Sequence, residues 1–212
     1  MRAVIFDLDG VLVFTDRFHY MAWKKMADGM GIDFDETINN RLRGVSRRES
    51  LEIILERYKG RSLSEKEKSE CMAYKNDCYT QLLKTMTPQD VATSTRETLE
   101  RLKGAGYKLA VGSSSKNTKF ILKQVELEGY FDAVSDGTNI THSKPDPEVF
   151  FKAADFLGET PSQCAVVEDA ESGILAAKSA AMTAFGIGDA ASCKLCDYTI
   201  QSLADLLDIL IG

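Results

Sequence analysis

Two aspartates lie one residue apart directly after an apolar run near the start of the chain. The run Ala3-Val4-Ile5-Phe6 leads into Asp7-Leu8-Asp9, and Gly10 follows. A short continuous apolar run of this kind is typical of a strand that is buried on both faces of a parallel sheet. Alternate residues of a strand face the same side. Both carboxylates can therefore point into one site at the carboxyl end of the strand.

Two carboxylates at this spacing repel each other, and each is costly to remove from water. A cation between them relieves both costs, and ligand sets made only of oxygen atoms suit Mg²⁺. The carboxyl edge of an open α/β sheet is also where such folds bind ligands. The pattern favours a magnesium and ligand site at Asp7 and Asp9, although two solvated aspartates before a glycine turn would have the same local sequence.

Three more polar clusters follow predicted strands farther along the chain. The strands are 109–112, 131–134 and 165–167, and the polar residues after them are Ser113, Lys144, Glu168 and Asp169. The carboxyl ends of parallel strands lie at one edge of a sheet, so these clusters should converge. Each has a simpler explanation on its own, because serines cap helices, lysines are often solvated and acidic pairs favour helix N-termini. Four clusters in the same relation to four strands favour a common site.

Strands that alternate with helices predict an α/β fold, a Rossmann-like core built on a parallel sheet. No strand pattern occurs between residues 15 and 106, so the first strand is followed by an inserted all-helical cap domain. We expect a core of 1–13 plus 90–212 and a cap of 14–89. Two capping boxes mark helix starts in the cap, Ser46 with Glu49 and Ser64 with Glu67.

The remaining elements follow from apolar periodicity and from glycine and proline positions. Predicted helices cover 15–30, the region after Asn117 to about Leu127, 147–158, 173–181 and 203–211, and a further strand covers 183–185. Thr85 to Ser94 contains Pro88 and has little periodicity, so we interpret it as the linker that returns from the cap to the core.

Composition and charge limit the classes of partner. The chain has 212 residues, 44% of them apolar and 27% charged, and a net charge of −6. These values are typical of a globular protein with a sizeable core, and an acidic chain without a basic run is a poor candidate for nucleic-acid binding. We find no signal-peptide pattern and no apolar run that could span a bilayer. We therefore expect a cytoplasmic monomer without a membrane or nucleic-acid partner.

Five cysteines are spread along the chain without a regular spacing: Cys71, Cys78, Cys164, Cys193 and Cys196. An odd number without a framework favours reduced thiols. Cys193-Lys194-Leu195-Cys196 is a CxxC motif, but a zinc site needs about four ligands and no second pair accompanies it. The role of this motif stays open.

The four clusters together resemble the haloacid dehalogenase superfamily of phosphotransferases. The matching segments are Asp7-Leu8-Asp9-Gly10, Ser113, Lys144-Pro145 and Glu168-Asp169. The resemblance implies that Asp7 is a nucleophile that forms an aspartyl-phosphate and that Asp9 is a general acid and base. It also implies that Ser113, Ser114 and Lys144 bind the phosphoryl group, and that Mg²⁺ is bound by Asp7, Asp9 (through its backbone carbonyl), Glu168 and Asp169.

The chemistry of phosphoryl transfer explains these residue types. A carboxylate that attacks a phosphate must overcome electrostatic repulsion, which a metal ion and a lysine offset. Ser113 and the backbone N–H groups after it are expected to open a helix, where an anion can bind. Asp9 is then free to protonate a leaving oxygen or to deprotonate an attacking hydroxyl.

The cap extends the resemblance to the bacterial beta-phosphoglucomutase family. The matching residues are Thr15, His19, Ala22-Trp23-Lys24, Gly44-Val45-Ser46-Arg47, Lys75-Asn76-Asp77 and Ser113 to Asn117. The resemblance implies interconversion of beta-glucose 1-phosphate and 6-phosphate through a bisphosphate. Arg47, with Arg43, would bind the distal phosphate, since guanidinium groups fit it bidentately. Lys75 and His19 would couple cap closure to substrate binding, Trp23 and Lys24 would line the sugar pocket, and Thr15 would lie at the hinge.

Two segments depart from the family pattern. Val13-Phe14 precedes Thr15, where the family usually has an aspartate, and Val91 to Ser94 stands where the family commonly has Pro-Gly. Three readings therefore remain open: the mutase, a sugar-phosphate phosphatase of the same fold in which water attacks, and a non-catalytic phosphate-binding module. The intact aspartate pair argues against the module. In the cap, His19 could equally be a surface histidine, Trp23 a core residue, and Arg47 part of a solvated arginine pair.

Overall fold

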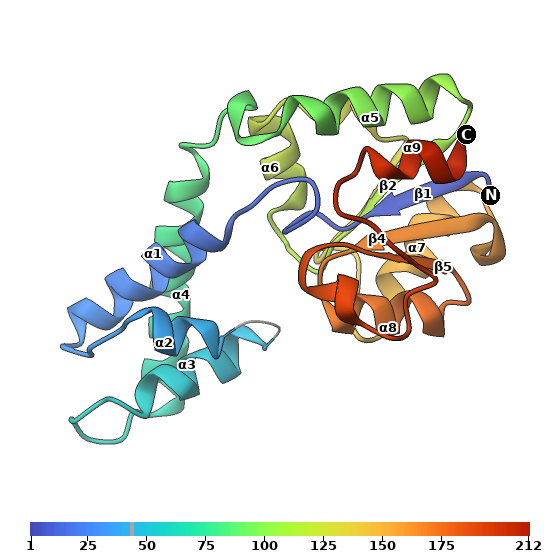
Figure 1. The fold of residues 1–212 in the computed structure, drawn as a ribbon. Coiled ribbons are helices and arrows are strands. Elements are labelled where there is room, and N and C mark those ends of the chain that lie inside the picture. The colour runs from blue at the N-terminus through green and yellow to red at the C-terminus, as the bar shows by residue number, and fades with distance from the viewer. Residues whose placement is uncertain (43–44) are drawn as a thin grey trace. The chain divides into compact units, whose positions relative to one another are not determined.

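The computed structural model describes residues 1–42 and 45–212, and these divide into two compact units (Figure 1). The core unit contains residues 1–14 and 86–212, and the cap unit contains residues 15–85. The sequence places the two boundaries at 13/14 and 89/90. Arg43 and Gly44, which the sequence analysis assigns to the cap, lie outside the described residues.

The core unit is built on a parallel six-stranded sheet with the strand order β3-β2-β1-β4-β5-β6. The strands are β1 (Ala3–Phe6), β2 (Lys108–Gly112), β3 (Ala133–Ser135), β4 (Cys164–Glu168), β5 (Thr183–Gly186) and β6 (Tyr198–Thr199). The predicted α/β fold is therefore confirmed. Strand order reverses between β1 and β4, and such a switch point opens a crevice at the carboxyl edge of the sheet.

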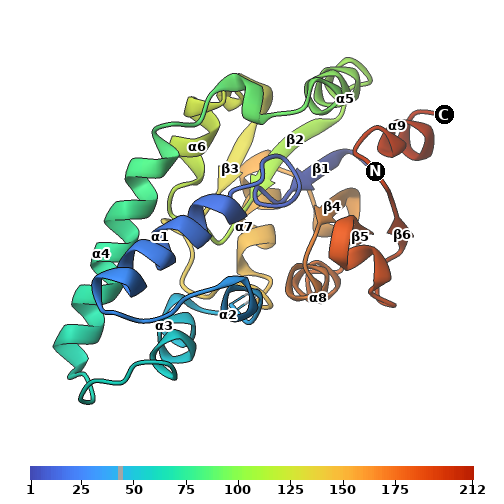
Figure 2. The ribbon, with the colours of Figure 1, turned by 60° about the vertical axis from the view of Figure 1, so that its left-hand side comes forward.

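Helices cover both faces of this sheet (Figure 2). They are α5 (Thr93–Gly104), α6 (Thr118–Gln124), α7 (Glu148–Leu157), α8 (Glu171–Ser179) and α9 (Asp205–Leu210). Short 3₁₀ turns are η1 (Pro88–Asp90), η2 (Glu128–Tyr130), η3 (Pro161–Gln163) and η4 (Gly188–Ser192). On one face α7 packs against β1, β2 and β3 and α8 against β4 and β5, while α5 contacts β2 and α9 on the other. All residues of β1 are buried, as a central strand between two helical layers requires.

Two elements of the core differ from the sequence predictions. The helix expected between Asn117 and about Leu127 begins at Thr118, as predicted, but ends earlier, at Gln124. Serine side chains in the turn before this helix accept hydrogen bonds from nearby backbone N–H groups, which competes with helix formation there. The expected linker from Thr85 to Ser94 is shorter than predicted, because α5 starts at Thr93.

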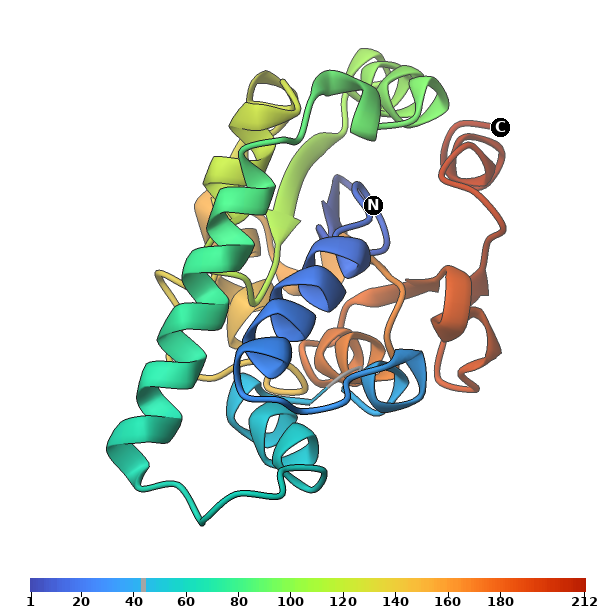
Figure 3. The same cartoon turned by 90° about the vertical axis from the view of Figure 1, so that its left-hand side faces the viewer.

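The described residues of the cap unit, 15–42 and 45–85, form four helices: α1 (Asp16–Gly29), α2 (Glu36–Asn40), α3 (Arg47–Leu55) and α4 (Glu65–Leu83). Both predicted capping boxes are confirmed, at the starts of α3 and α4. The two longest helices, α1 and α4, lie side by side (Figure 3). Their buried faces join α2 and α3 in one apolar cluster, which contains Trp23, Met26, Ala27, Ile32, Phe34, Ile38, Leu51 and Ile54. Within the described residues, no helix combines the length and the apolar character needed to cross a membrane.

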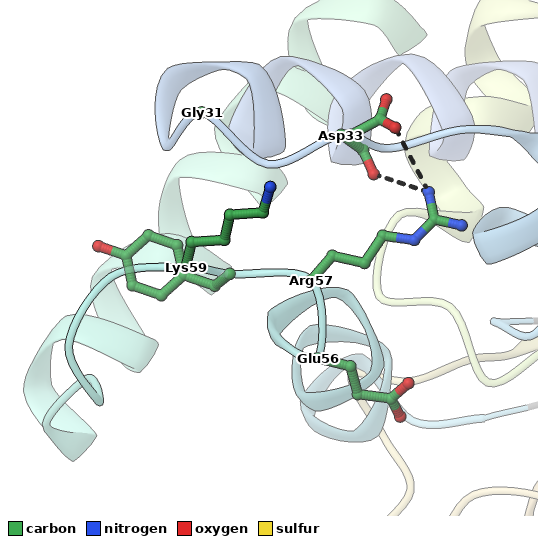
Figure 4. Close-up of a pocket in the computed structure, with 6 residues that line it drawn as sticks. Gly31, Asp33, Glu56, Arg57 and Lys59 are labelled. Carbon is green, nitrogen blue, oxygen red and sulfur yellow. Dashed lines mark hydrogen bonds and ion pairs between the residues drawn. The ribbon is translucent and has the colours of Figure 1, made fainter.

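A shallow hollow lies at the far end of α3 in the cap unit (Figure 4). Its lining includes Gly31, Asp33 and Arg57, and the Arg57 guanidinium donates to the Asp33 carbonyl at 3.0 Å. None of the described residues that the sequence predicts for the site lines this hollow. The predicted catalytic residues lie instead at the carboxyl edge of the sheet in the core unit.

Candidate active site

Asp7 extends from the end of β1 into the carboxyl edge of the sheet. Its residue exposure is 7%, and its backbone N–H donates to the Val167 carbonyl of β4 at 2.9 Å. The chain then turns back, with the Gly10 N–H bonded to the Val13 carbonyl at 2.7 Å. Gly10 has φ +79°, a conformation that residues with a Cβ rarely adopt. The turn holds Asp7 and Asp9 at the carboxyl end of β1.

The structure brings Asp7, Glu168 and Asp169 together, and we call these residues the acidic cluster. One carboxylate oxygen from each lies within 4.8 Å of those of the other two. Glu168 ends β4 and is almost fully buried, while Asp169 is half-buried. The side chain of Asp9 is not a member of this group among the described residues, and its predicted metal contact uses the backbone carbonyl instead.

Two glycines give the acidic cluster its space. A Cβ at Gly10 would lie 1.9 Å from the Asp169 Oδ2 atom, and a Cβ at Gly173 would lie 1.9 Å from the Glu168 Cδ atom. Both carboxylates therefore lie directly against the backbone of a glycine, and any larger residue at either glycine would overlap the carboxylate. The sequence analysis treats Gly10 only as a turn residue and Gly173 only as part of a helix. The approach of Gly10 to Asp169 joins segments far apart in the chain and leaves no local signal, whereas Gly173 lies only five residues after Glu168, in the first turn of the helix that follows β4.

Lys144 lies between two members of the acidic cluster. Its ammonium donates hydrogen bonds to Asp7 Oδ1 and to Glu168 Oε1. The side chain is 9% exposed, and the Nζ atom lies 4.8 Å from the centroid of the Phe150 ring. Burial by itself would lower the pKa of Lys144, but the charges of Asp7 and Glu168 outweigh it and raise the pKa above its usual value. Lys144 is therefore a fixed cation beside Asp7.

The acidic cluster carries more negative charge than Lys144 neutralises. Burial, together with the charges of Glu168, Asp7 and Asp9, raises the pKa of Asp169 to about 8. Burial also raises the pKa of Glu168, against the opposing effect of Lys144. A divalent cation would offset this excess, and the donor set consists only of oxygen atoms from one sheet edge. The acidic cluster thus fits Mg²⁺.

The serine loop, residues 113–117, lies at the carboxyl end of β2. Ser113 is buried, and its Oγ accepts a hydrogen bond from the Ser115 N–H at 3.2 Å. The Oγ of Ser114 accepts from the backbone N–H of Lys144 at 3.4 Å, so this loop and the Lys144 loop are joined. Asn117, also predicted for the site, donates its N–H to Ser115 Oγ at 3.2 Å. The structure therefore brings the predicted phosphate-binding residues Ser114 and Lys144 together.

A carboxylate also organises the Lys144 loop. Glu148 Oε2 accepts hydrogen bonds from the backbone N–H groups of Thr141 at 2.8 Å and His142 at 2.7 Å. Lys152, with these N–H groups, lowers the pKa of Glu148 to about 2. His142, Asp146 and Glu148 place possible metal-ligand atoms near one another, but two of the three residues are exposed. We interpret His142, Asp146 and Glu148 as residues that stabilise the conformation of the Lys144 loop and not as a metal site.

The cap unit brings three predicted residues, His19, Trp23 and Lys75, together with Tyr79, and we call these four residues the cap cluster. The Lys75 Nζ atom lies 2.9 Å from His19 Nδ1, 5.0 Å from the centroid of the Trp23 ring and 4.8 Å from that of Tyr79. Burial, together with the charges of Lys75 and Arg47, lowers the pKa of His19 to about 3. His19 is therefore neutral at neutral pH, and the ammonium of Lys75 is the donor to it.

The other predicted cap residues differ in whether they contact the cap cluster. Thr15 is fully buried, and its Oγ1 is hydrogen-bonded to the Tyr79 hydroxyl at 3.1 Å. Arg47 begins α3 and donates to Asn76 Oδ1 on α4 at 3.0 Å. Lys24 pairs with Asp28 on the exposed side of α1 at 3.0 Å and does not join the cluster. Trp23 is 3% exposed and packs in the apolar cluster of the cap, the alternative that the sequence left open.

Tyr79 is a residue that the sequence analysis missed. It follows Lys75 by four residues, and this spacing places two side chains on the same face of a helix. Helical periodicity could therefore have found it. All five cysteines are free thiols, and Cys196 donates its thiol to the Ala190 carbonyl at 3.3 Å.

Comparison with known proteins supports the same chemistry. The chain is 41% identical to the beta-phosphoglucomutase of Bacillus subtilis (strain 168) over 208 residues, which cover 97% of this chain and 92% of that protein. It is 34% identical to a phosphorylated carbohydrates phosphatase of Thermotoga maritima over 182 residues, which cover 85% of this chain and 82% of that protein.

A solved structure, the beta-phosphoglucomutase of Clostridium difficile, matches with a TM-score of 0.84 and 36% identity over 97% of this chain and 93% of that one. A family model described as haloacid dehalogenase-like hydrolase matches residues 1–181. The predicted resemblance is confirmed, and the relatives support an enzyme of phosphoryl transfer. The chain belongs to the haloacid dehalogenase-like hydrolase family.

Proposed function

We propose that this enzyme is a Mg²⁺-dependent beta-phosphoglucomutase that interconverts beta-glucose 1-phosphate and beta-glucose 6-phosphate. The observation that carries the proposal is a buried cationic centre in each unit, Lys144 in the core and Lys75 in the cap. A mutase passes through a bisphosphate and has to bind two phosphates, whereas hydrolysis of a monoester requires only one. The 41% identity to a beta-phosphoglucomutase supports this choice.

Asp7 is the proposed nucleophile, and its attack on the phosphoryl group gives an aspartyl-phosphate. Lys144 donates to Asp7 Oδ1, which holds the carboxylate in one orientation and offsets the charge of the incoming phosphate. Mg²⁺ bound by Asp7, Glu168 and Asp169 would supply further positive charge for the same purpose. Asp9 is the proposed acid and base that gives a proton to the leaving oxygen and takes one from the attacking hydroxyl.

The cap residues are proposed to distinguish a sugar phosphate from water. Arg47 is the proposed ligand of the second phosphate, since its guanidinium offers a bidentate set of donors. Lys75 and His19 are proposed to link substrate binding to cap closure, and Trp23, Lys24 and Asn117 to contact the substrate. A hinge role for Thr15 stays a prediction, as do the monomeric state and the cytoplasmic location.

A sugar-phosphate phosphatase is the second candidate. It is supported by the 34% identity to a phosphatase that acts on phosphorylated carbohydrates. In this reading the aspartyl-phosphate at Asp7 is attacked by water, with Asp9 as the base. The family result makes the chain an enzyme, so a non-catalytic phosphate-binding module is not retained.

One assay separates the two candidates. The protein is given beta-glucose 1-phosphate, Mg²⁺ and a trace of the 1,6-bisphosphate, and glucose 6-phosphate and free phosphate are followed in parallel. We expect isomer without stoichiometric release of phosphate. Release of phosphate as the main product would replace the mutase with the phosphatase. If the wild type and Asp7→Asn were equally inactive on a panel of sugar phosphates, both proposals would fail.

A further inference from the structure

Asp136 directly follows β3 and is fully buried. Its Oδ2 atom has no hydrogen-bond partner among the residues that the structure describes. A buried carboxylate oxygen without a partner is costly, because it loses its contact with water and gains nothing in return. Stability alone therefore does not explain an aspartate at this position. The contacts of its other oxygen, Oδ1, indicate what the residue does.

The second carboxylate oxygen of Asp136 shapes the turn after β3. Oδ1 accepts hydrogen bonds from the backbone N–H of Thr138 at 2.9 Å and from its hydroxyl at 2.5 Å. Asn139 closes the same turn, because its Oδ1 accepts from the Asp136 N–H at 3.2 Å and its N–H donates to the Asp136 carbonyl at 3.0 Å. The turn from Ser135 to Asn139 is therefore held by side chains that bond back to their own backbone.

This turn is the support of the serine loop. The Ser113 N–H donates to the Ser135 carbonyl at 3.0 Å, and the Gly137 N–H donates to the Ser115 carbonyl at 3.0 Å. A Cβ at Gly137 would lie 2.4 Å from the Ser114 carbonyl oxygen and 2.9 Å from the Lys116 nitrogen. The backbones of the turn and of the loop are thus in direct contact, and a change in one has to move the other.

We propose that Asp136 is a positioning residue for the substrate phosphate. It fixes the turn from Ser135 to Asn139, and this turn fixes the backbone of the serine loop, including Ser113 and Ser114. The inference rests on the proposed function, in which those serines bind the transferring phosphoryl group. Asp136 acts through the turn and does not touch the substrate.

The experiment measures inorganic phosphate binding by calorimetry in the presence of Mg²⁺, together with kcat and KM for beta-glucose 1-phosphate. Asp136→Ala removes the acceptor for Thr138. We expect the dissociation constant of phosphate and the KM to rise between about 10-fold and 100-fold, because the loop is displaced from its binding geometry. Asp136→Asn retains an oxygen at Oδ1 and should stay within about 3-fold of the wild type.

Asp132→Ala is the matched control. Asp132 lies at the opposite end of β3, where its Oδ2 accepts from the Leu109 N–H at 2.8 Å. The Asp132→Ala variant should be less stable than the wild type but should bind phosphate with unchanged affinity. Equal phosphate affinity in Asp136→Ala and the wild type would overturn the proposal, as would a loss of affinity in Asp136→Asn as large as in Asp136→Ala.

A second variant covers the case in which Asp136→Ala does not fold. Gly137→Ala introduces the close contact with Ser114 and should weaken phosphate binding in the same way; unchanged binding would again contradict the proposal. The failure of the proposed function has a different signature. A wild type that binds phosphate but converts no sugar phosphate would remove the mutase and the phosphatase, and would leave the phosphate-binding comparison among the variants intact.

Discussion

Two buried lysines, one in each unit, are stabilised by different surroundings. Lys144 donates to two carboxylates at the edge of the core sheet. Lys75 is 2% exposed and lies against a neutral imidazole and the faces of two aromatic rings. The first lysine belongs to a group that already has excess negative charge, whereas the second adds positive charge to an apolar setting. In the proposed function, the core binds a metal ion with a phosphate, and the cap binds a second phosphate.

Replacement of each lysine by methionine should show the largest difference between the core and the cap, in the free energy of unfolding. Without Mg²⁺, Lys144→Met leaves Asp7 and Glu168 without their partner, and we expect it to lower the free energy of unfolding by about 3–5 kcal/mol. Lys75→Met retains the packing and loses a cation–π contact, so about 1–2 kcal/mol is expected. Denaturant unfolding gives both values.

The same two variants differ in turnover. Lys144→Met should lower kcat/KM by about 10³-fold for both a sugar phosphate and a small phosphate ester. Lys75→Met should affect the sugar phosphate and leave the small ester nearly unchanged. If both variants lost activity on both substrates equally, the proposed division between core and cap would be wrong.

Gly173→Ala tests how closely the acidic cluster is packed. The added Cβ would collide with the Glu168 carboxylate, so the affinity for Mg²⁺ should fall by up to about 100-fold. Calorimetric titration with Mg²⁺ measures this affinity. Gly104→Ala is the control, because it also lies in a helix of the core unit and its Cβ would meet no atom within 4 Å. A Mg²⁺ affinity that stays at the wild-type value in Gly173→Ala would show that the cluster does not hold the ion.

Arg47→Ala tests the role of the cap as an anion site. We expect it to lower mutase turnover by about 10- to 30-fold, because a charged hydrogen bond to the second phosphate is lost. Hydrolysis of a small phosphate ester should hardly change. Arg48→Ala is the neighbouring control, since Arg48 is paired with Glu52 and Glu65 and is not proposed to bind substrate. Equal losses on the two substrates would remove the distal-phosphate role of Arg47.

The smallest effect concerns the titration of His19. The chain has two histidines, so their NMR signals are easily assigned, and the exposed His142 serves as the internal reference. His19 should remain neutral down to a pH of about 3, and Lys75→Met should raise its pKa. A wild-type His19 that titrates near 6.5 would show that it is not buried beside Lys75.

The same shift has a consequence for stability. Because the pKa of His19 is lower in the folded state than in the unfolded chain, the unfolded state binds the extra proton between pH 6.5 and about 3. The stability contribution of a neutral His19 is therefore complete above pH 6.5 and is lost as the pH falls through this window. His19→Gln should remove this part of the pH dependence.

The sequence predicts those parts of the site that depend on short-range rules. Asp7 and Glu168 were found because both follow buried strands, and helix starts at Ser46 and Ser64 were found because capping boxes are local. The start of α6 after Asn117 is predictable for the same reason, because the serines before it satisfy nearby backbone groups.

Other features depend on contacts between distant segments and leave no local signal. The close approach of Gly10 to Asp169 exists only because β1 and β4 are neighbours. The two-residue strand β6 is too short for a pattern, and its Tyr198 ring stacks on Phe185 of β5 at a centroid distance of 4.8 Å. Asp136-Gly137 has the sequence of an ordinary turn, and only burial distinguishes it.

The position of β1 in the sheet has a consequence for how the site forms. Ala3 pairs with Lys108 on one side and with Cys164 on the other, so both partners of β1 come from much later in the chain. Closing such long loops carries a larger entropic cost than closing the shorter loops between contacts within the cap. On the ribosome, Asp7 is made long before Glu168 and Asp169, so it cannot acquire its acidic neighbours until residue 169 has left the exit tunnel.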